Sequence, residues 1–179
     1  MHMATKTRPW TRADLARLPD DGNRYEVLDG ELLVTPQANP PHQWIATELA
    51  SALRDYCTRH SLGVVVGPGA VVFGKNELQP DVEVIPCAPG ELARRWDDVP
   101  TPILVIEILS EGSRRHDRVT KRDAYRDRGI PVYWIVDPEE RTVRVVRPDR
   151  ADEVVADVLR WQPVSALEPL EIDLSAILR

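Results

Sequence analysis

The sequence ILVIEIL at residues 103–109, followed by RRHDRVTKRDAYRDR at 114–128 and VYWIV at 132–136, decides the fold. The outer two stretches are apolar enough for buried strands. The middle stretch has the length of a helix, with Ser113 as its cap and Gly129 at its end. A strand, a helix and a strand in this order predict a parallel crossover, and therefore a mixed sheet with helices packed on it.

Turn and capping signals extend this core towards the N-terminus. Asp29-Gly30 supplies the positive φ angles of a tight turn, so residues 24–34 predict a β-hairpin. Pro40-Pro41 opens a helix that continues to about His60, with Trp44 on its apolar face. We further expect strands at 62–66, 70–73, 80–85 and 142–146, short helices at 11–18 and 91–96, and a strand or two and a last helical turn in 151–179.

Length and composition predict a single α/β domain over residues 1–179, with residues 1–9 flexible. The 179 residues are 42% hydrophobic and include five Trp, which supports a well-packed core. The net charge of −6 excludes a polycation, so any contact with nucleic acid must use a local basic face.

The cysteines and the hydropathy predict a cytoplasmic protein. Cys57 and Cys87 lie far apart and lack metal-ligand spacing, so we expect reduced thiols. The chain starts without an apolar signal segment, and no apolar run reaches the ~18 residues that a membrane span needs. We therefore expect no membrane partner.

Two acidic residues on apolar strands carry the chemistry. A carboxylate in a buried strand costs several kcal/mol unless it is paired or binds a metal. If the strands of Asp81 and Glu107 are neighbours, both side chains can converge on one Mg²⁺, for which Mn²⁺ can substitute. The main-chain carbonyl of Ile108 is a further candidate ligand. Glu83 shares the face of Asp81, either tuning the metal site or facing solvent.

Lys121 is unusual because only three of the 23 basic residues are lysines. A compact ammonium can polarise a water, whereas arginine is planar and stays charged. A solvated helix residue is an equally weighted interpretation. Arg118 and Arg122 on the same helix are candidate phosphate ligands, although a solvated face explains most arginines of this helix as well.

Together these residues resemble the Uma-type family of the PD-(D/E)XK nuclease superfamily, whose fold is restriction-endonuclease-like. The resemblance runs from about Leu15 to Pro148, and the order and spacing of its pieces are more specific than any one piece. The pieces are LPDDGNRYEVLDGEL at 18–32, PHQ at 41–43, QPD at 79–81, VIEILS at 105–110, RHDR at 115–118 with Lys121, and YWIVDP at 133–138.

The resemblance implies that Asp81 and Glu107 hold the metal and that Lys121 assists the attacking water. The usual lysine position, two residues after the glutamate, holds Leu109 here. Glu26 matches the family as a further acid at the site, or as a residue that hydrogen-bonds the hairpin. His42 either caps the long helix or touches substrate, with the structural role favoured. The chain departs from the family pattern at Glu111, Thr120 and Val132.

These observations favour an Mg²⁺-dependent endonuclease that cleaves DNA. A non-catalytic DNA- or protein-binding module on the same fold is the main alternative, and a hydrolase of smaller phosphate esters is a third. Because cleavage of a duplex needs two cuts, we expect a homodimer. Its exposed contact segments would lie near Trp10 and Trp161.

Overall fold

The computed structural model describes residues 8–88, 90–110, 114 and 116–179. The expected cap Ser113 and residues 1–7 of the expected flexible segment lie outside this range. Arg8 is described, and its guanidinium pairs with the Asp14 carboxylate at 2.9 Å. Asp14 belongs to the short helix α1 (Arg12–Leu15), where it forms a capping box with Thr11.

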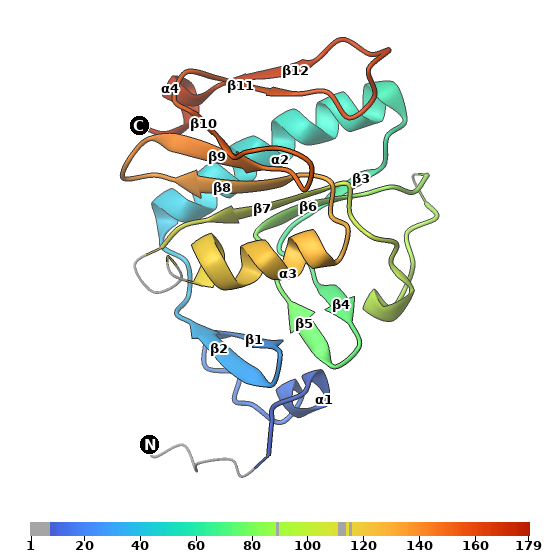
Figure 1. Ribbon diagram of the computed structural model, residues 1–179, viewed down its shortest axis with the longest axis vertical. Coiled ribbons are helices and arrows are strands. Elements are labelled where there is room, and N and C mark those ends of the chain that lie inside the picture. The colour runs from blue at the N-terminus through green and yellow to red at the C-terminus, as the bar shows by residue number, and fades with distance from the viewer. Residues whose placement is uncertain (1–7, 89, 111–113, 115) are drawn as a thin grey trace.

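A six-stranded sheet forms the centre of the molecule (Figure 1), with the strand order β10-β9-β8-β7-β6-β3. Strand β7 lies inside it and pairs in parallel with β8, as the crossover predicts, while its pairing with β6 is antiparallel. The mixed sheet is therefore confirmed. The strands are β3 (Val64–Val66), β6 (Val82–Ile85), β7 (Leu104–Ile108), β8 (Tyr133–Asp137), β9 (Thr142–Val146) and β10 (Glu153–Val155).

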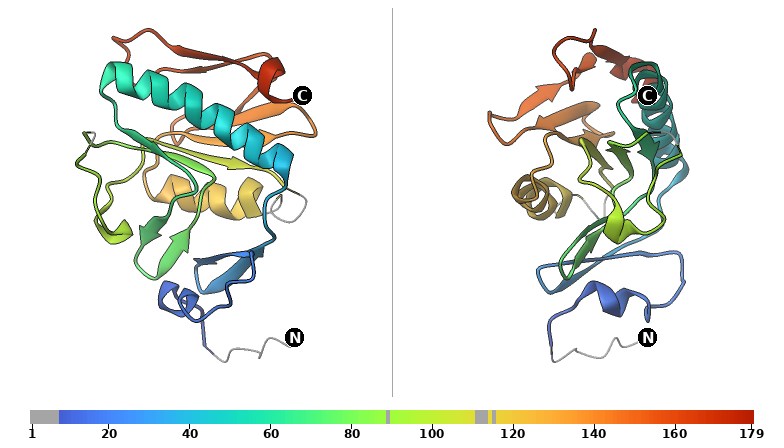
Figure 2. Two further views of the ribbon diagram at one scale, coloured as in Figure 1. Left: turned by 180° about the vertical axis from the view of Figure 1, so that it is seen from behind. Right: turned by 90° about the vertical axis from the view of Figure 1, so that its right-hand side faces the viewer.

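Helices cover both faces of this sheet (Figure 2). Helix α2 (Pro40–His60) has the predicted bounds and packs Leu49 and its neighbours against Leu104 and Ile106 of β7. The opposite face carries α3 (Lys121–Asp127), whose Tyr125 packs against Val105. The helices on both faces explain why β7 is buried along its whole length and apolar at every position except Glu107. Trp44 is 51% exposed, so its assignment to the apolar face of α2 was wrong.

The crossover helix begins differently from the prediction. Residues His116–Thr120 form a π-helical turn, η2, and helix α3 starts at Lys121. Gly129 follows the helix with φ +72°, in agreement with its predicted place at the helix end. The π-helical turn, which is wider than an α-helical turn, ends immediately before Lys121.

A smaller four-stranded sheet lies below the central sheet in Figure 1, in the order β2-β1-β5-β4. Its hairpin β1 (Arg24–Leu28) and β2 (Glu31–Thr35) turns at Asp29 and Gly30, which have φ +48° and +88°. Strand β4 (Val71–Phe73) was expected, whereas β5 (Asn76–Leu78) was not.

The C-terminal segment packs alongside α2 (Figure 2). It consists of β11 (Val158–Trp161), β12 (Leu170–Asp173) and α4 (Leu174–Ile177). Trp161 is 1% exposed and belongs to the core, so it cannot be the exposed dimer contact that we expected. The helix expected at 91–96 is also absent from the described residues of that segment, where a 3₁₀ turn, η1, covers Trp96–Asp98. No helix within the described ranges is long and apolar enough to cross a membrane.

Candidate active site

The two predicted acids face each other across neighbouring strands. The antiparallel register pairs Val82 with Ile106 and Glu83 with Val105, so one further step places Asp81 opposite Glu107. The amide of Asp81 donates to the carbonyl of Ile106 at 3.1 Å. The two strands are therefore neighbours, as a site shared by Asp81 and Glu107 requires.

Asp81 is held by three donors. Its Oδ1 accepts from Arg24 Nη1 at 2.7 Å, and its Oδ2 accepts from the amide of Ile108 at 2.7 Å and lies 3.2 Å from His42 Nε2. Burial opposes ionisation of this carboxyl, but the His42 hydrogen bond and the Arg24 charge outweigh it, so the pKa of Asp81 is lowered. Asp81 is therefore a fixed, ionised carboxylate.

Glu107 is completely buried and only half satisfied. Its Oε1 accepts from Lys121 Nζ at 2.9 Å and from the Tyr125 hydroxyl at 3.0 Å. Its Oε2 has no hydrogen-bond partner among the described residues. Burial raises the pKa of Glu107 well above its usual value; Lys121 opposes this rise, and Asp117 and Asp81 add to it.

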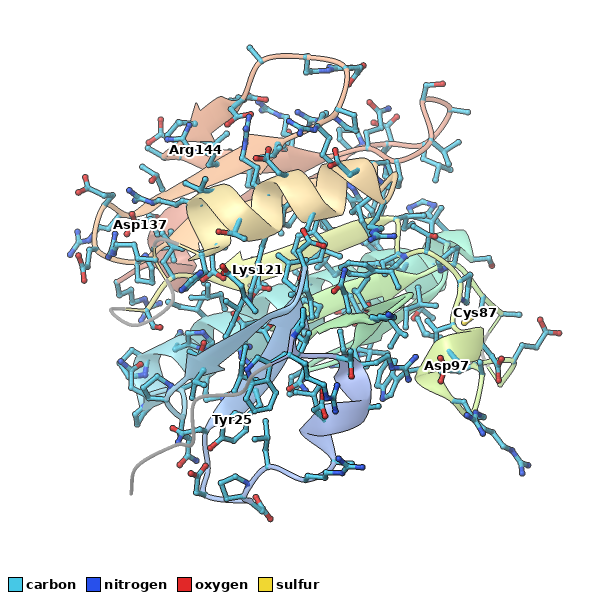
Figure 3. All side chains as sticks on the ribbon, turned by 60° about the horizontal axis from the view of Figure 1, so that its bottom comes forward. Tyr25, Cys87, Asp97, Lys121, Asp137 and Arg144 are labelled. Carbon is cyan, nitrogen blue, oxygen red and sulfur yellow. The ribbon has the colours of Figure 1, made fainter. Side chains whose placement is uncertain are left out.

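Lys121 lies beneath α3, between this helix and the small sheet (Figure 3). Its ammonium is 2.9 Å from both Glu26 and Glu107 and 3.1 Å from Asp117, and its side chain is 1% exposed. The interpretation as a solvated helix residue was therefore wrong. Although burial disfavours the charged form, the three carboxylates outweigh it and raise the pKa of Lys121.

Glu26 is both an acid of the site and a hydrogen-bonding residue, the two roles that were predicted as alternatives. Its Oε1 accepts from the amide of Gln79 at 2.7 Å, while Oε2 pairs with Lys121. It thus belongs to the acidic cluster and also fixes the segment that leads to Asp81, rather than the β1–β2 turn.

His42 does not cap α2 with its side chain. The cap is Asn39, whose Oδ1 accepts from the amide of His42 at 2.9 Å. The imidazole instead points to the site, where Nε2 lies 3.1 Å from the carbonyl oxygen of Ile108 as well as close to Asp81. Five of the predicted residues are therefore in one cluster around Asp81: Glu26, His42, Glu107, Ile108 and Lys121.

Glu83 does not face solvent, so that alternative was wrong. Its side chain is fully buried beside Gly69, and burial raises its pKa to about 7. Neither carboxylate oxygen has a hydrogen-bond partner in the described part of the chain.

Arg118 and Arg122 are not brought into this cluster. Arg118 pairs with Asp137 and Arg122 with Asp152, the latter at 2.8 Å. Asp137 lies at the end of β8, away from Lys121 in Figure 3.

Arg24 was not predicted as a residue of the site. Its Nη1 donates to the Gln79 carbonyl as well as to Asp81, and its side chain is 18% exposed. The signal was its position two residues before Glu26, because alternate side chains of a strand share a face. Burial opposes its charge, but Glu107, Asp81 and Glu26 raise the pKa of Arg24.

A cavity of about 270 Å³ opens next to Asp81. Arg24 and His42 line it together with Asp81, so the cluster has a route to solvent. Most other polar lining groups are neutral amides and hydroxyls. They come from Asn23, Thr35, Gln37, Gln43, Gln79 and Ser110.

The cluster fits a divalent cation in charge and in donor atoms. Among the described residues, four carboxylates, of Glu26, Asp81, Glu107 and Asp117, lie against two side chains of fixed positive charge, Arg24 and Lys121. The free oxygen of Glu107 and the carbonyl of Ile108 are oxygen donors of the kind that Mg²⁺ prefers. No three His, Cys, Asp or Glu side chains of the described residues already converge as ligands of one ion.

A mixed sheet with an Asp and a Glu opposed on adjacent strands and a lysine on the crossover helix defines a restriction-endonuclease-like protein. The chain belongs to the family described as "Uma2: Putative restriction endonuclease", which matches residues 12–176. Its fold is similar to the crystal structure of a protein from Anabaena variabilis described as a putative nuclease belonging to DUF820. The two chains are 20% identical with a TM-score of 0.77, over 95% of this chain and 98% of the other. A comparison with curated proteins gave no match.

Proposed function

We propose that this protein is an Mg²⁺-dependent endonuclease that hydrolyses phosphodiester bonds of DNA, with Mn²⁺ as a substitute. The observation that carries the proposal is the free Oε2 of Glu107, which is buried on the strand opposite the ionised Asp81. Asp81 in turn lines the cavity. An unpaired buried carboxylate oxygen costs about 1–3 kcal/mol or more, and a metal ligand role removes that cost.

The bound ion would be held by Asp81, Glu107 and the carbonyl of Ile108. When bound, it supplies charge neutralisation on the phosphate and a water of lowered pKa. Lys121 holds Glu107 in place through Oε1, which leaves Oε2 for the ion. Its contacts with three carboxylates favour this positioning role over direct contact with the water.

Arg24 is the cation best placed to contact substrate. It lines the cavity and reaches Asp81, whereas Arg118 and Arg122 are engaged by Asp137 and Asp152. A guanidinium binds a phosphate through two parallel hydrogen bonds. We therefore assign the scissile phosphate to Arg24 and leave Arg118 and Arg122 an outer role on the DNA backbone.

The test is cleavage of supercoiled plasmid and single-stranded DNA with Mg²⁺, with Mn²⁺ and with EDTA. We expect metal-dependent cleavage by the unaltered protein and none by Asp81→Asn or Glu107→Gln. Asp55→Asn, which changes an exposed acid on α2, is the matched control and should cleave normally. Equal cleavage by Asp81→Asn and the unaltered protein would refute the assignment.

We propose a homodimer as the cleaving species, since two strands must be cut. Light scattering should give twice the chain mass of 20.2 kDa at tens of micromolar. A mass equal to that of one chain, together with undiminished cleavage of duplex DNA, would contradict the proposed dimer.

A further inference from the structure

His42 presents one ring nitrogen to two of the atoms at which the proposed metal site is centred. Nε2 is 3.2 Å from Asp81 Oδ2 and 3.1 Å from the Ile108 carbonyl oxygen. These contacts join the start of α2 to the segment before β6 and to the end of β7. The imidazole is buried, so its direction is set by the protein rather than by solvent.

The distances from Nε2 to the two oxygens match those between adjacent ligands of one ion. Adjacent ligands of an octahedral ion at about 2.1 Å lie about 3.0 Å apart. The two measured separations from Nε2 are close to that value. Coordination would therefore need a small displacement and the transfer of the ring proton from Nε2 to Nδ1, which leaves the Nε2 lone pair for the ion.

Nothing else holds the ring in its present direction. The second ring nitrogen, Nδ1, is buried and has no hydrogen-bond partner in the part of the chain that the structure describes. The orientation of the imidazole therefore depends on Nε2 and on packing. A residue needed only to donate one hydrogen bond to Asp81 would be redundant, because Arg24 and the Ile108 amide already donate to that carboxylate.

We propose that His42 is a nitrogen ligand, through Nε2, of the divalent ion held by Asp81 and the Ile108 carbonyl. This inference rests on the proposed metal-dependent function and adds a preference among divalent ions. Imidazole is a good ligand of transition metals, whereas Mg²⁺ selects oxygen. The site therefore binds Mn²⁺ in preference to Mg²⁺.

Direct coordination has a spectroscopic signature that requires no variant. Mn²⁺ bound to the full-length protein should show a ¹⁴N hyperfine coupling in pulsed electron paramagnetic resonance. That coupling should change to a ¹⁵N pattern when the protein is made with ¹⁵N-histidine. A bound Mn²⁺ without nitrogen coupling would overturn the inference while leaving a metal-dependent nuclease intact.

Affinity gives the second measurement. By calorimetry, His42→Ala should weaken Mn²⁺ binding by about tenfold or more and Mg²⁺ binding less, so that the Mn²⁺/Mg²⁺ affinity ratio falls. Gln43→Ala, the next residue and also a cavity-lining side chain, should leave the ratio unchanged. An equal loss for both ions would indicate a structural role for His42 and overturn the inference. No binding of either ion by the unaltered protein would overturn the proposed function together with it.

Discussion

Lys121 shows how one ammonium can organise three carboxylates in the interior. It joins Glu26 of the small sheet, Glu107 of the central sheet and Asp117 of the π-helical turn. Each carboxylate alone would be costly to bury, and removing the cation from such a network leaves its charges uncompensated. The residue therefore links the geometry of the candidate site to stability.

Lys121→Ala should reduce the free energy of unfolding by about 3–5 kcal/mol, because three buried acids lose their shared cation. Urea denaturation at pH 7 measures this loss of unfolding free energy. Lys75→Ala, at an exposed position in the turn between β4 and β5, should change stability by no more than about 0.5 kcal/mol. Similar, small effects of both substitutions would contradict the buried network.

The residue types of the site were predictable, but their partners were not. An acid that interrupts an apolar run and a rare lysine identified Glu107 and Lys121 from the sequence alone. The sequence does not show which acids surround the lysine, because Glu26 reaches it from a strand 95 positions earlier. Arg24 and the buried state of Glu83 likewise depend on contacts between distant segments.

At the scale of elements, the segment before β6 is packed tightly against the segment that contains Gly67. A Cβ on Gly67 would lie 2.3 Å from the carbonyl oxygen of Asp81. Backbone atoms cannot yield as a flexible side chain can, so Gly67 is needed for the close approach. The position of Asp81 depends on it.

Gly67→Ala should therefore cost about 1–3 kcal/mol of stability and lower cleavage strongly, because it displaces Asp81. Gly74→Ala is the matched control. Gly74 has φ +58° with nothing within 4 Å of a Cβ, so it should lose only about 1 kcal/mol from backbone strain and keep cleavage. Full cleavage by Gly67→Ala would show that Asp81 tolerates the displacement.

Helix α2 carries a buried thiol whose titration should be visible at alkaline pH. Burial raises the pKa of Cys57 from 9.0 to about 11. The unfolded chain then loses its thiol proton first, so this stabilising contribution is complete below pH 9 and is lost as the pH rises towards 11.

The unfolding free energy should accordingly decline between pH 9 and 11, by roughly 2 kcal/mol from this group. Cys57→Ala should show a shallower decline over the same interval, whereas Cys87→Ala, a partly exposed thiol, should follow the unaltered protein. Parallel curves for all three proteins would exclude a buried, protonated Cys57.

Local patterns predicted the long and strongly marked elements. The hairpin at Asp29-Gly30, helix α2 and the parallel β7–β8 pair were all predicted. Short elements were missed or misplaced because tertiary pairing decides them: β5 has three residues and exists by pairing with β1 and β4. Helical periodicity was also insufficient to show that Trp44 faces outward.

Across the whole molecule, negative charge is concentrated inside as well as spread over the surface. The chain carries a net charge of −6, and the buried cluster has two more carboxylates than cations. Crowding of carboxylates in a low-dielectric interior is destabilising, and it adds to the rise in the pKa of Glu107. A divalent cation that enters by the cavity beside Asp81 would remove that excess and stabilise the folded state.

Mn²⁺ should therefore raise the thermal stability of the protein itself, without DNA. An ion present at 100 times its Kd adds about 2.7 kcal/mol to the free energy of unfolding by linkage. For a domain of this size that shift raises Tm by roughly 5–10 °C, which differential scanning calorimetry resolves. Asp81→Asn combined with Glu107→Gln should abolish the shift, while Asp55→Asn should retain it. Sodium chloride of equal ionic strength separates specific binding from screening of the −6 net charge. An equal rise in the double variant would place the ion elsewhere on the protein.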